Sequence, residues 1–385
     1  MNVAFDPWIP VVTMAGERKL ASLSEVLSNG AQYADLSVRP HERVALMRLF
    51  LCVAHAALDG PKNYPEWCNV PNKLPEAAKS YLEKWNDEEH DAFELFHHEK
   101  PWLQVKELKG VERDTRNSEK TSPVALLDSE LATGNNSTLF DHEGSMAIRM
   151  VAPARLALNL LTFQNFSSGG GSPVAQWKKK KTSQVGNPDA PCLSQSMSHC
   201  FFRGRNLAET IHLNLPIHER IGMVYRSFSL DKKKEKYSFN DIQMGKPVWE
   251  CFPNSPDDSM SVANATRTYL GRLVPISRWV RLIENTDQMF CCNGFKYDTY
   301  KDGFLAEPTA AVRLVTKKDR KGVETTERRV VGVSPSRATW RELSALLTRA
   351  SIRAIENRVE CITGKVLDSV KWVPPSERKR QLAYA

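Results

Sequence analysis

Two short runs of histidine and acidic residues are the places in this sequence where hydrolytic chemistry could occur. His97-His98-Glu99 and Asp141-His142-Glu143 supply imidazole and carboxylate groups, which act as metal ligands or general bases in nucleases. No His-Glu-x-x-His, Gly-x-Ser-x-Gly or Walker pattern accompanies them. We therefore expect no set of catalytic residues. The alternative is a metal-dependent nuclease that uses His97, His98, Asp141 and His142.

The cysteines have spacings that suit a metal ion poorly. Cys251, Cys291 and Cys292 could meet His199 and Cys200 in space, but adjacent cysteines differ from the two-residue spacing that zinc sites use. Eight cysteines in 385 residues, without a secretion signal, predict free thiols. We expect no metal and no cofactor.

Glycine and lysine clusters are better suited to binding a polyanion. The run Gly169, Gly170 and Gly171 would let bare backbone approach a ligand, although a flexible linker has the same composition. Lysine clusters on loops are natural partners of phosphates, the alternative being a solvated surface. The formal net charge of +8 favours polyanionic partners. The clustered lysines are Lys178, Lys179, Lys180, Lys181, Lys232, Lys233, Lys234, Lys317 and Lys318.

Two segments combine aromatic and polar residues in a way typical of proteins that probe a DNA groove. One runs from Asn135 to His142, and the other is Gly294-Phe295-Lys296-Tyr297. Amide and ammonium groups with an apolar wedge can enter a minor groove or brace an opened base step. Ordinary packing of the aromatic rings is the alternative interpretation.

The elements that would position these residues are helices and strands mixed along the chain. Two short strands around a turn are expected between Trp8 and Leu20, and a helix follows Pro40 from Val44 to Leu58, ending at Asp59-Gly60-Pro61. We further predict helices over about 76–96 and 153–163, a strand at 210–215, short strands between 278 and 315, a loop at 107–136 with an apolar turn at 124–127, and a helix from the 339–342 capping box to residue 372.

Length and composition indicate a globular α+β protein. With 41% hydrophobic and 25% charged residues, we expect a large mixed N-terminal domain at 1–335 and a short C-terminal helical segment at 336–385. The chain opens without a secretion signal, and its most apolar stretch, Val44 to Leu58, is too short to span a bilayer. We therefore predict a cytoplasmic protein without a membrane partner.

Several motifs, taken in order, resemble the CasA family, the large subunit of the type I-E CRISPR surveillance complex called Cascade. The resemblance runs from residue 1 to about residue 347. Its motifs are Met1-Asn2-Val3-Ala4-Phe5-Asp6-Pro7-Trp8-Ile9-Pro10-Val11, His98-Glu99-Lys100-Pro101-Trp102-Leu103-Gln104, the triple glycine, Phe202-Arg203-Gly204-Arg205 and Lys246-Pro247-Val248-Trp249.

The resemblance implies antiviral defence by a protein that is not an enzyme. It implies recognition of the protospacer-adjacent motif in double-stranded DNA from the minor groove, followed by duplex opening and R-loop formation, with the guide reading the target by base pairing. The implied partners are CRISPR RNA, other Cascade subunits and target DNA. The motif readers would be Gly169, Gly170, Gly171 and Lys296, and the loop near the guide and DNA would contain Asn135, Asn136, Phe140 and His142, with Phe140 the best-matched position.

The resemblance also implies a strand-separating hairpin and a C-terminal four-helix bundle, most of which this sequence would lack as a short variant. We therefore assign no wedge residue. Recruitment of a helicase-nuclease by this chain stays open, and cleavage by a nuclease carried on another subunit is a hypothesis. A purely structural subunit is the third alternative.

Overall fold

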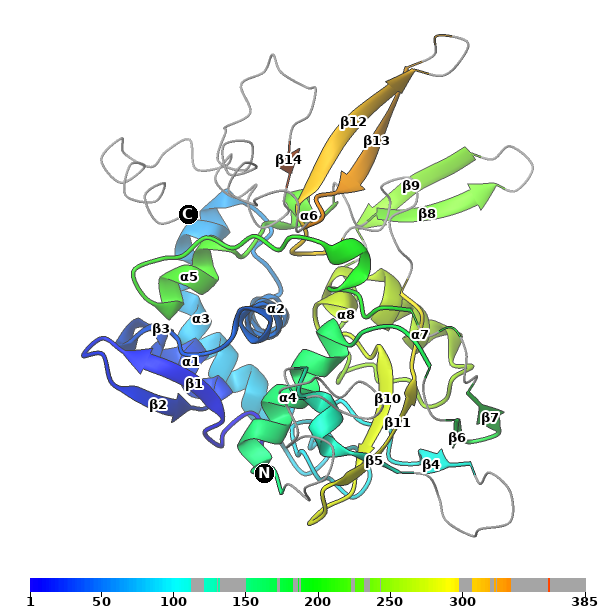
Figure 1. Ribbon diagram of the computed structural model, residues 1–385. Helices are drawn as coiled ribbons and strands as arrows, with labels where there is room; N and C mark the ends of the chain where they lie inside the picture. The colour runs from blue at the N-terminus through cyan, green and yellow to red at the C-terminus, as the bar shows by residue number, and fades with distance from the viewer. Residues whose placement is uncertain are drawn as a thin grey trace.

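The fold alternates helices with small antiparallel sheets (Figure 1), which confirms the expected α+β class. A computed structural model describes residues 1–111, 121–129, 131, 150–171, 174–182, 186, 188–222, 226–231, 236–242, 244–297, 307–318, 322, 324–333 and 359–360. For residues 219, 222, 226–231, 236–242, 312–318, 324–329 and 359–360, only the backbone is described.

The chain opens with a sheet in the strand order β2-β1-β3. β1 (Ile9–Thr13) pairs with β2 (Arg18–Ala21), which confirms the predicted hairpin, and with β3 (Tyr33–Leu36) on its other edge. α1 (Leu23–Asn29) begins at Ser22, whose hydroxyl accepts the Glu25 amide hydrogen while the Glu25 carboxylate accepts that of Ser22. This reciprocal capping box satisfies two amides at the start of the helix.

α2 (Pro40–Leu58) lies at the centre of the molecule, between α3 and the elements around α8 (Figure 1). The helix prediction is confirmed, with Pro40 in its first turn and Asp59 in a left-handed conformation at its end. Every residue from Ala45 to His55 is buried, so α2 is covered on all sides. A helix buried all round, rather than amphipathic, forms the middle of the core.

Two predictions for the elements around α2 are wrong. A helix was expected over about 76–96, but α3 runs over Tyr64–Lys84; the Asn63 side chain caps its start, and Pro71 and Pro75 lie inside it. Residues 210–215 were expected to form a strand, but α5 (Leu207–Leu213) begins after the capping side chain of Asn206. In both cases an asparagine side chain caps the start of a helix that the apolar pattern did not predict at that position.

A second packing unit joins α4 (Pro153–Phe166), which confirms the predicted helix, to a sheet in the order β10-β11-β5. β10 (Arg278–Leu282) and β11 (Gln288–Asn293) pair over five residues, and β5 (Ser122–Pro123) adds to the edge of β11. The expected short strands after residue 278 and the apolar turn at Val124–Leu127, a 3-10 turn, are therefore confirmed.

Smaller elements surround these two units. β4 (Lys109–Gly110), β6 (Ala175–Trp177) and β7 (Lys180–Lys181) form one sheet, and β8 (Arg226–Asp231) and β9 (Lys236–Ile242) form a hairpin. β12 (Val312–Lys318) pairs with β13 (Glu324–Val330) in a hairpin that projects outward in Figure 1. The short helices are α6 (His218–Gly222), α7 (Ser259–Arg267) and α8 (Tyr269–Leu273).

The predicted C-terminal helix is wrong at the two residues where it can be compared. Val359–Glu360 form β14, which pairs antiparallel with the start of β12. The rest of the expected helix, and most of the 336–385 segment, lies outside the described residues. Within the described part, no helix is both long and apolar enough to cross a bilayer.

Candidate nucleic-acid interface

Arg278 fixes the base of the glycine run. This first residue of β10 is only 3% exposed. Its backbone amide donates to the side-chain oxygen Oε1 of Gln164 at 2.9 Å, and Gln164 Nε2 donates to the Arg278 carbonyl at 2.8 Å. The Arg278 guanidinium donates to the carbonyls of Ser168 at 3.0 Å and Pro188 at 2.9 Å. The end of α4 and the residues just after it are therefore attached firmly to β10.

The glycine run leaves this anchor as exposed backbone. The Gly169 amide donates to the Asp189 carboxylate at 2.7 Å, and Gly170 and Gly171 are exposed. Gly170 has φ +133°, a conformation that other residues rarely adopt, and a Cβ there would meet no described heavy atom within 4 Å. Glycine is required here by the backbone conformation rather than by crowding, so the loop presents bare backbone outward.

Lys296 is held between two buried aromatic residues. Phe295 packs edge to face on Trp177 and Trp279, with ring centroids 6.2 and 5.7 Å away. The Tyr297 hydroxyl accepts the Ile276 amide hydrogen at 2.7 Å. Both rings are therefore packed in the core, as the packing interpretation expects, while the Lys296 side chain between them is exposed.

The glycine run and Lys296 are attached to the same short segment. The Gly294 amide donates to the Ser277 carbonyl, and the Phe295 amide donates to the Ile276 carbonyl. A Cβ at Gly294 would lie 2.5 Å from the Ser277 carbonyl carbon, so only glycine permits this approach. Because Arg278 directly follows these residues and holds Ser168, one rigid segment positions both predicted motif readers.

A buried ion group contacts the ring of Tyr297, the residue after Lys296. Glu307 is 1% exposed and pairs with Arg272 and, at 3.0 Å, with Arg48, both almost fully buried. Burial alone would raise the pKa of Glu307, but the Arg272 and Arg48 guanidinium groups hold it below its usual value. Arg272 also lies over the Tyr297 ring at 5.4 Å. This ion group links α2, α8 and the 307–311 segment under the aromatic anchors of Lys296.

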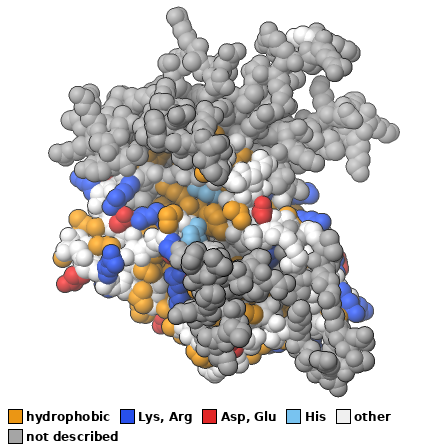
Figure 2. Space-filling model, in the orientation of Figure 1, with side chains coloured by type: hydrophobic (Ala, Val, Ile, Leu, Met, Phe, Trp, Pro, Cys, Tyr) orange, Lys and Arg blue, Asp and Glu red, His pale blue; other side chains and the backbone are white. Residues whose placement is uncertain are grey.

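The predicted phosphate-binding lysines are described only in part. Lys178, Lys179, Lys180 and Lys181 lie on the β6–β7 hairpin and are exposed, with Lys180 paired to Asp257 at 2.9 Å. On the face shown in Figure 2, basic side chains lie at several separate places rather than in one patch. Lys317 and Lys318 are at the end of β12, where only the backbone is described, and Lys232, Lys233 and Lys234 lie outside the described residues.

The nuclease alternative can be compared only at its first two residues. The His97 Nε2 atom is 3.0 Å from the Asp91 carboxylate, and its Nδ1 accepts the amide hydrogens of Glu99 and Lys100. Both ring nitrogens of His97 therefore have structural partners. Asp141 and His142 lie outside the described residues, as do Asn135, Asn136 and Phe140.

The cysteine positions show separate environments. Burial lowers the pKa of His199 to about 4, and its ring nitrogens contact Thr309 Oγ1 at 2.8 Å and the Cys192 carbonyl at 2.9 Å. Burial also raises the pKa of Cys291 to about 12. In the part of the chain that the structure describes, no three His, Cys, Asp or Glu side chains gather as a metal site, and the described cysteines are free thiols.

Sequence reasoning missed Arg278, Arg48, Arg272 and Glu307. Arg48 lies within the most apolar stretch of the sequence, and Arg278 is the first residue of the region where short strands are expected. A charged residue inside an apolar run is the one signal that pointed to them, since buried charges are rare unless they are paired. Their partners are distant in sequence, with Arg48 and Glu307 far apart along the chain.

Comparison with known proteins places this chain in a family. The family model for CRISPR-associated protein Cse1 matches residues 2–371, and the chain belongs to that family. This confirms the resemblance noted from the sequence. A curated relative, the CasA/Cse1 protein of Thermus thermophilus, is 28% identical over 384 residues, covering 95% of this chain and 64% of the relative. The chain therefore spans slightly less than two thirds of that relative's length.

Solved structures share the fold. Cse1 from Thermobifida fusca matches with a TM-score of 0.72 and 21% identity, covering 97% of this chain and 68% of that one. Cse1 from Acidimicrobium ferrooxidans matches with a TM-score of 0.67 and 18% identity, and the match covers 95% of this chain and 63% of that one. A chain of a structure described as a CRISPR RNA-guided surveillance complex matches with a TM-score of 0.63 and 19% identity. This match covers 96% of this chain and 69% of that one.

Proposed function

We propose that this protein is the DNA-reading large subunit of an RNA-guided surveillance complex in CRISPR antiviral defence, acting in the cytoplasm by binding rather than by catalysis. Family membership supports the class of protein, and one structure with this fold is described as a CRISPR RNA-guided surveillance complex. The partners proposed for this chain are CRISPR RNA, the other subunits of the complex and target double-stranded DNA. The N-terminal 1–335 segment would be the DNA-recognition domain.

One observation supports the reading mechanism more than any other. Arg278 holds Ser168, which directly precedes the glycine run with its exposed Gly170 and Gly171 backbone. The neighbouring carbonyls of Ser277 and Ile276 hold the residues just before the exposed Lys296. Bare backbone can approach the floor of a minor groove, and an extended cation can reach the base-edge acceptors there. In this proposal these groups inspect the flanking motif, the Lys178–Lys181 hairpin contacts phosphates, and binding promotes opening of the adjacent duplex. The 135–142 loop would approach the guide and the DNA.

Lys296→Ala tests the reading mechanism directly. In the assembled complex we expect binding to a motif-bearing duplex to weaken by about 1–3 kcal/mol, roughly a factor of 5 to 150, because one groove contact is lost. A target whose strands are already separated should bind almost as before. The measurement is a titration of labelled duplex, with Lys73→Ala, an exposed lysine on α3, as the matched control. Equal binding by the unaltered complex of duplexes with and without the flanking motif would contradict the proposal.

Gly170→Ala separates backbone strain from DNA contact. Because its φ is +133°, we expect the substitution to lower the free energy of unfolding by about 1–3 kcal/mol. Gly16→Ala is a matched control, since Gly16 has φ +89° in the β1–β2 turn and equally open space around it. Both variants should lose stability in urea titrations, but only Gly170→Ala should weaken binding to motif-bearing duplex. A loss of duplex binding in both would show that the effect is one of stability alone.

A further inference from the structure

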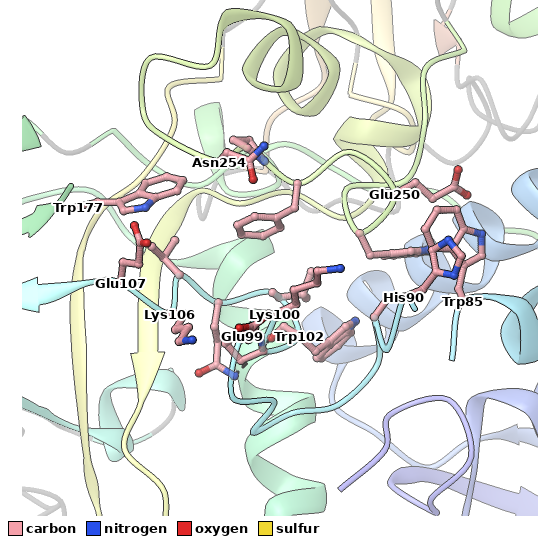
Figure 3. Close-up of a pocket in the computed structure, with 18 of the residues that line it drawn as sticks. Trp85, His90, Glu99, Lys100, Trp102, Lys106, Glu107, Trp177, Glu250 and Asn254 are labelled. Atoms are coloured by element: carbon pink, nitrogen blue, oxygen red, sulfur yellow. Dashed lines mark hydrogen bonds between the residues drawn. The ribbon is translucent and has the colours of Figure 1, made fainter. Parts of the chain in front are cut away.

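A cavity beside the proposed DNA site has, apart from Lys178 in its lining, no part in the function argued so far. It has a volume of about 630 Å³ and lies between the segment around 99–107, the segment around 249–254 and the first residues after α3 (Figure 3). Trp177 lines one end. Because Trp177 packs on Phe295, the residue before Lys296, this end of the cavity adjoins the anchors of the proposed motif reader.

The cavity is walled by aromatic side chains from separate parts of the chain. Trp85, Trp102, Trp177, Trp249 and Phe252 all line it. Trp249 is fixed because its Nε1 donates to the Tyr81 hydroxyl at 2.9 Å. A concave site with several large aromatic walls suits a flat, conjugated ligand, since stacking on aromatic rings does not depend on a particular hydrogen-bonding edge.

Trp102 provides a polar group that lacks a partner. It is 1% exposed, and its Nε1 has no acceptor within hydrogen-bonding distance among the described residues. Its neighbour Trp8, with ring centroids 5.9 Å apart, donates its own Nε1 to the Val3 carbonyl at 2.7 Å. Buried donors are nearly always paired, so an occupant that brings an acceptor would complete this site. A guanidinium or ammonium group has no acceptor and could not.

The floor of the cavity is held in a fixed, strained shape. Leu103 has φ +54°, which is uncommon for a residue other than glycine. The Gln104 side chain fixes this segment, because its Nε2 donates to the Leu95 carbonyl at 2.6 Å and its Oε1 accepts the Leu282 amide hydrogen at 2.8 Å. Trp102, which directly precedes Leu103, therefore lies in a rigid loop that lines the cavity.

Charges of both signs surround the opening. Lys100, Lys106 and Lys178 are exposed at the lining, together with the carboxylates of Glu99 and Glu107. A base edge has both donors and acceptors, and the phosphate attached to its sugar is an anion. Carboxylates can accept from base amino groups, whereas the lysines can pair with phosphate. The mixed rim therefore matches a nucleotide within a strand better than a purely cationic or purely anionic ligand.

We propose that this cavity receives one unpaired base of a nucleic-acid strand, which stacks on its tryptophans and accepts a hydrogen bond from Trp102 Nε1. The inference rests on the proposed function, because duplex opening supplies unpaired bases next to the motif reader. The strand is either the opened DNA or the guide RNA, which share this chemistry.

The test measures the binding of three tetramers, each a four-unit nucleic-acid strand, to the full-length protein. The strands are four deoxyadenylates, four adenylates in RNA, and four abasic deoxyribose phosphates. Quenching of tryptophan fluorescence gives each affinity. We expect a base-bearing tetramer to bind roughly tenfold or more tightly than the abasic one, since stacking on aromatic residues contributes strongly for each base. Tighter binding of the DNA tetramer would indicate the opened target strand, and tighter binding of the RNA tetramer the guide. Equal affinity of all three would overturn the proposal.

Trp102→Phe and Trp8→Phe form a matched pair. Each exchanges a buried indole for a smaller ring, but only Trp102 lines the cavity. We expect Trp102→Phe to weaken binding of the base-bearing tetramer at least fivefold and Trp8→Phe to leave it unchanged, with folding checked by thermal unfolding. An identical response in the two variants would mean that the Trp102 indole hydrogen is satisfied by water rather than by a base, and would overturn the assignment.

Lys106→Ala provides a second test that leaves the core intact. Lys106 and Lys109 are both exposed, but only Lys106 lines the cavity. Lys106→Ala should weaken all three tetramers alike and reduce the salt dependence of their binding, whereas Lys109→Ala should not. No difference between these two variants would contradict a phosphate at the rim.

The two proposals fail separately. Loss of motif dependence in duplex binding, with base-dependent and Trp102-dependent tetramer binding intact, would remove the proposed reading mechanism but keep the cavity assignment. Motif-dependent, Lys296-dependent duplex binding, with abasic and base-bearing tetramers bound equally, would remove only the cavity assignment.

Discussion

Glu307→Gln should lower the free energy of unfolding by about 3–5 kcal/mol, because it leaves two arginines in the core without their counter-charge. Arg48 and Arg272 are 0% and 2% exposed, and both pair with Glu307. Neutralising the carboxylate leaves two buried guanidinium groups without this negative charge in a place that water does not reach. Urea titration of the purified chain, followed by tryptophan fluorescence, measures the change, with the exposed Glu88→Gln as the matched control.

The pH dependence identifies the charge as the cause. The pKa of Glu307 is lowered in the folded protein by Arg272 and Arg48, which outweigh the opposing effect of burial. A lowered folded pKa contributes stability above the unfolded pKa, and that contribution is lost as pH falls through the folded pKa. The stability difference between the unaltered protein and Glu307→Gln should therefore be full at neutral pH and shrink in acid. A difference that stays constant in acid would mean that shape, rather than charge, is responsible.

Arg278→Met should have the second largest effect, on both stability and DNA binding. The guanidinium donates to the Ser168 and Pro188 carbonyls, and hydrogen bonds from a charged group contribute roughly 1.5–3 kcal/mol each. We expect a loss of about 3 kcal/mol or more in the free energy of unfolding. Because Ser168 directly precedes the glycine run, the backbone that would enter the groove also loses its anchor.

Arg281→Met separates these effects from general changes on β10. Arg281 is on the same strand but half-buried, with its guanidinium over the Phe290 ring at 4.5 Å. We expect Arg281→Met to lower stability by less and to leave motif-dependent duplex binding unchanged, as measured by the same titrations. If Arg278→Met has the same urea midpoint of unfolding as the unaltered protein and still binds the motif normally, the glycine run does not depend on this anchor.

Local patterns predicted the elements whose signals were complete within a few residues. The β1–β2 hairpin, α2 with its proline start and left-handed end, and α4 are examples. Predictions failed where one local signal was misleading. Pro71 and Pro75 lie inside α3 and argued against a helix there, so the predicted helix began too late. The alternation of Ile211, Leu213 and Leu215 suggested a strand where the Asn206 cap begins α5.

The sequence by itself determined the fold class, the family and the residue types of the candidate site, because motif order and composition are properties of the chain alone. Only the tertiary structure decided which side chains act together. Lys296 could be told from its aromatic neighbours once Phe295 and Tyr297 were seen to be buried. Residues 276–278 contact Ser168, just before the glycine run, and also the 294–295 backbone just before Lys296, although these segments are distant in sequence. The physical reason is that burial and pairing of a side chain depend on the residues packed around it, and these come from segments far apart in sequence.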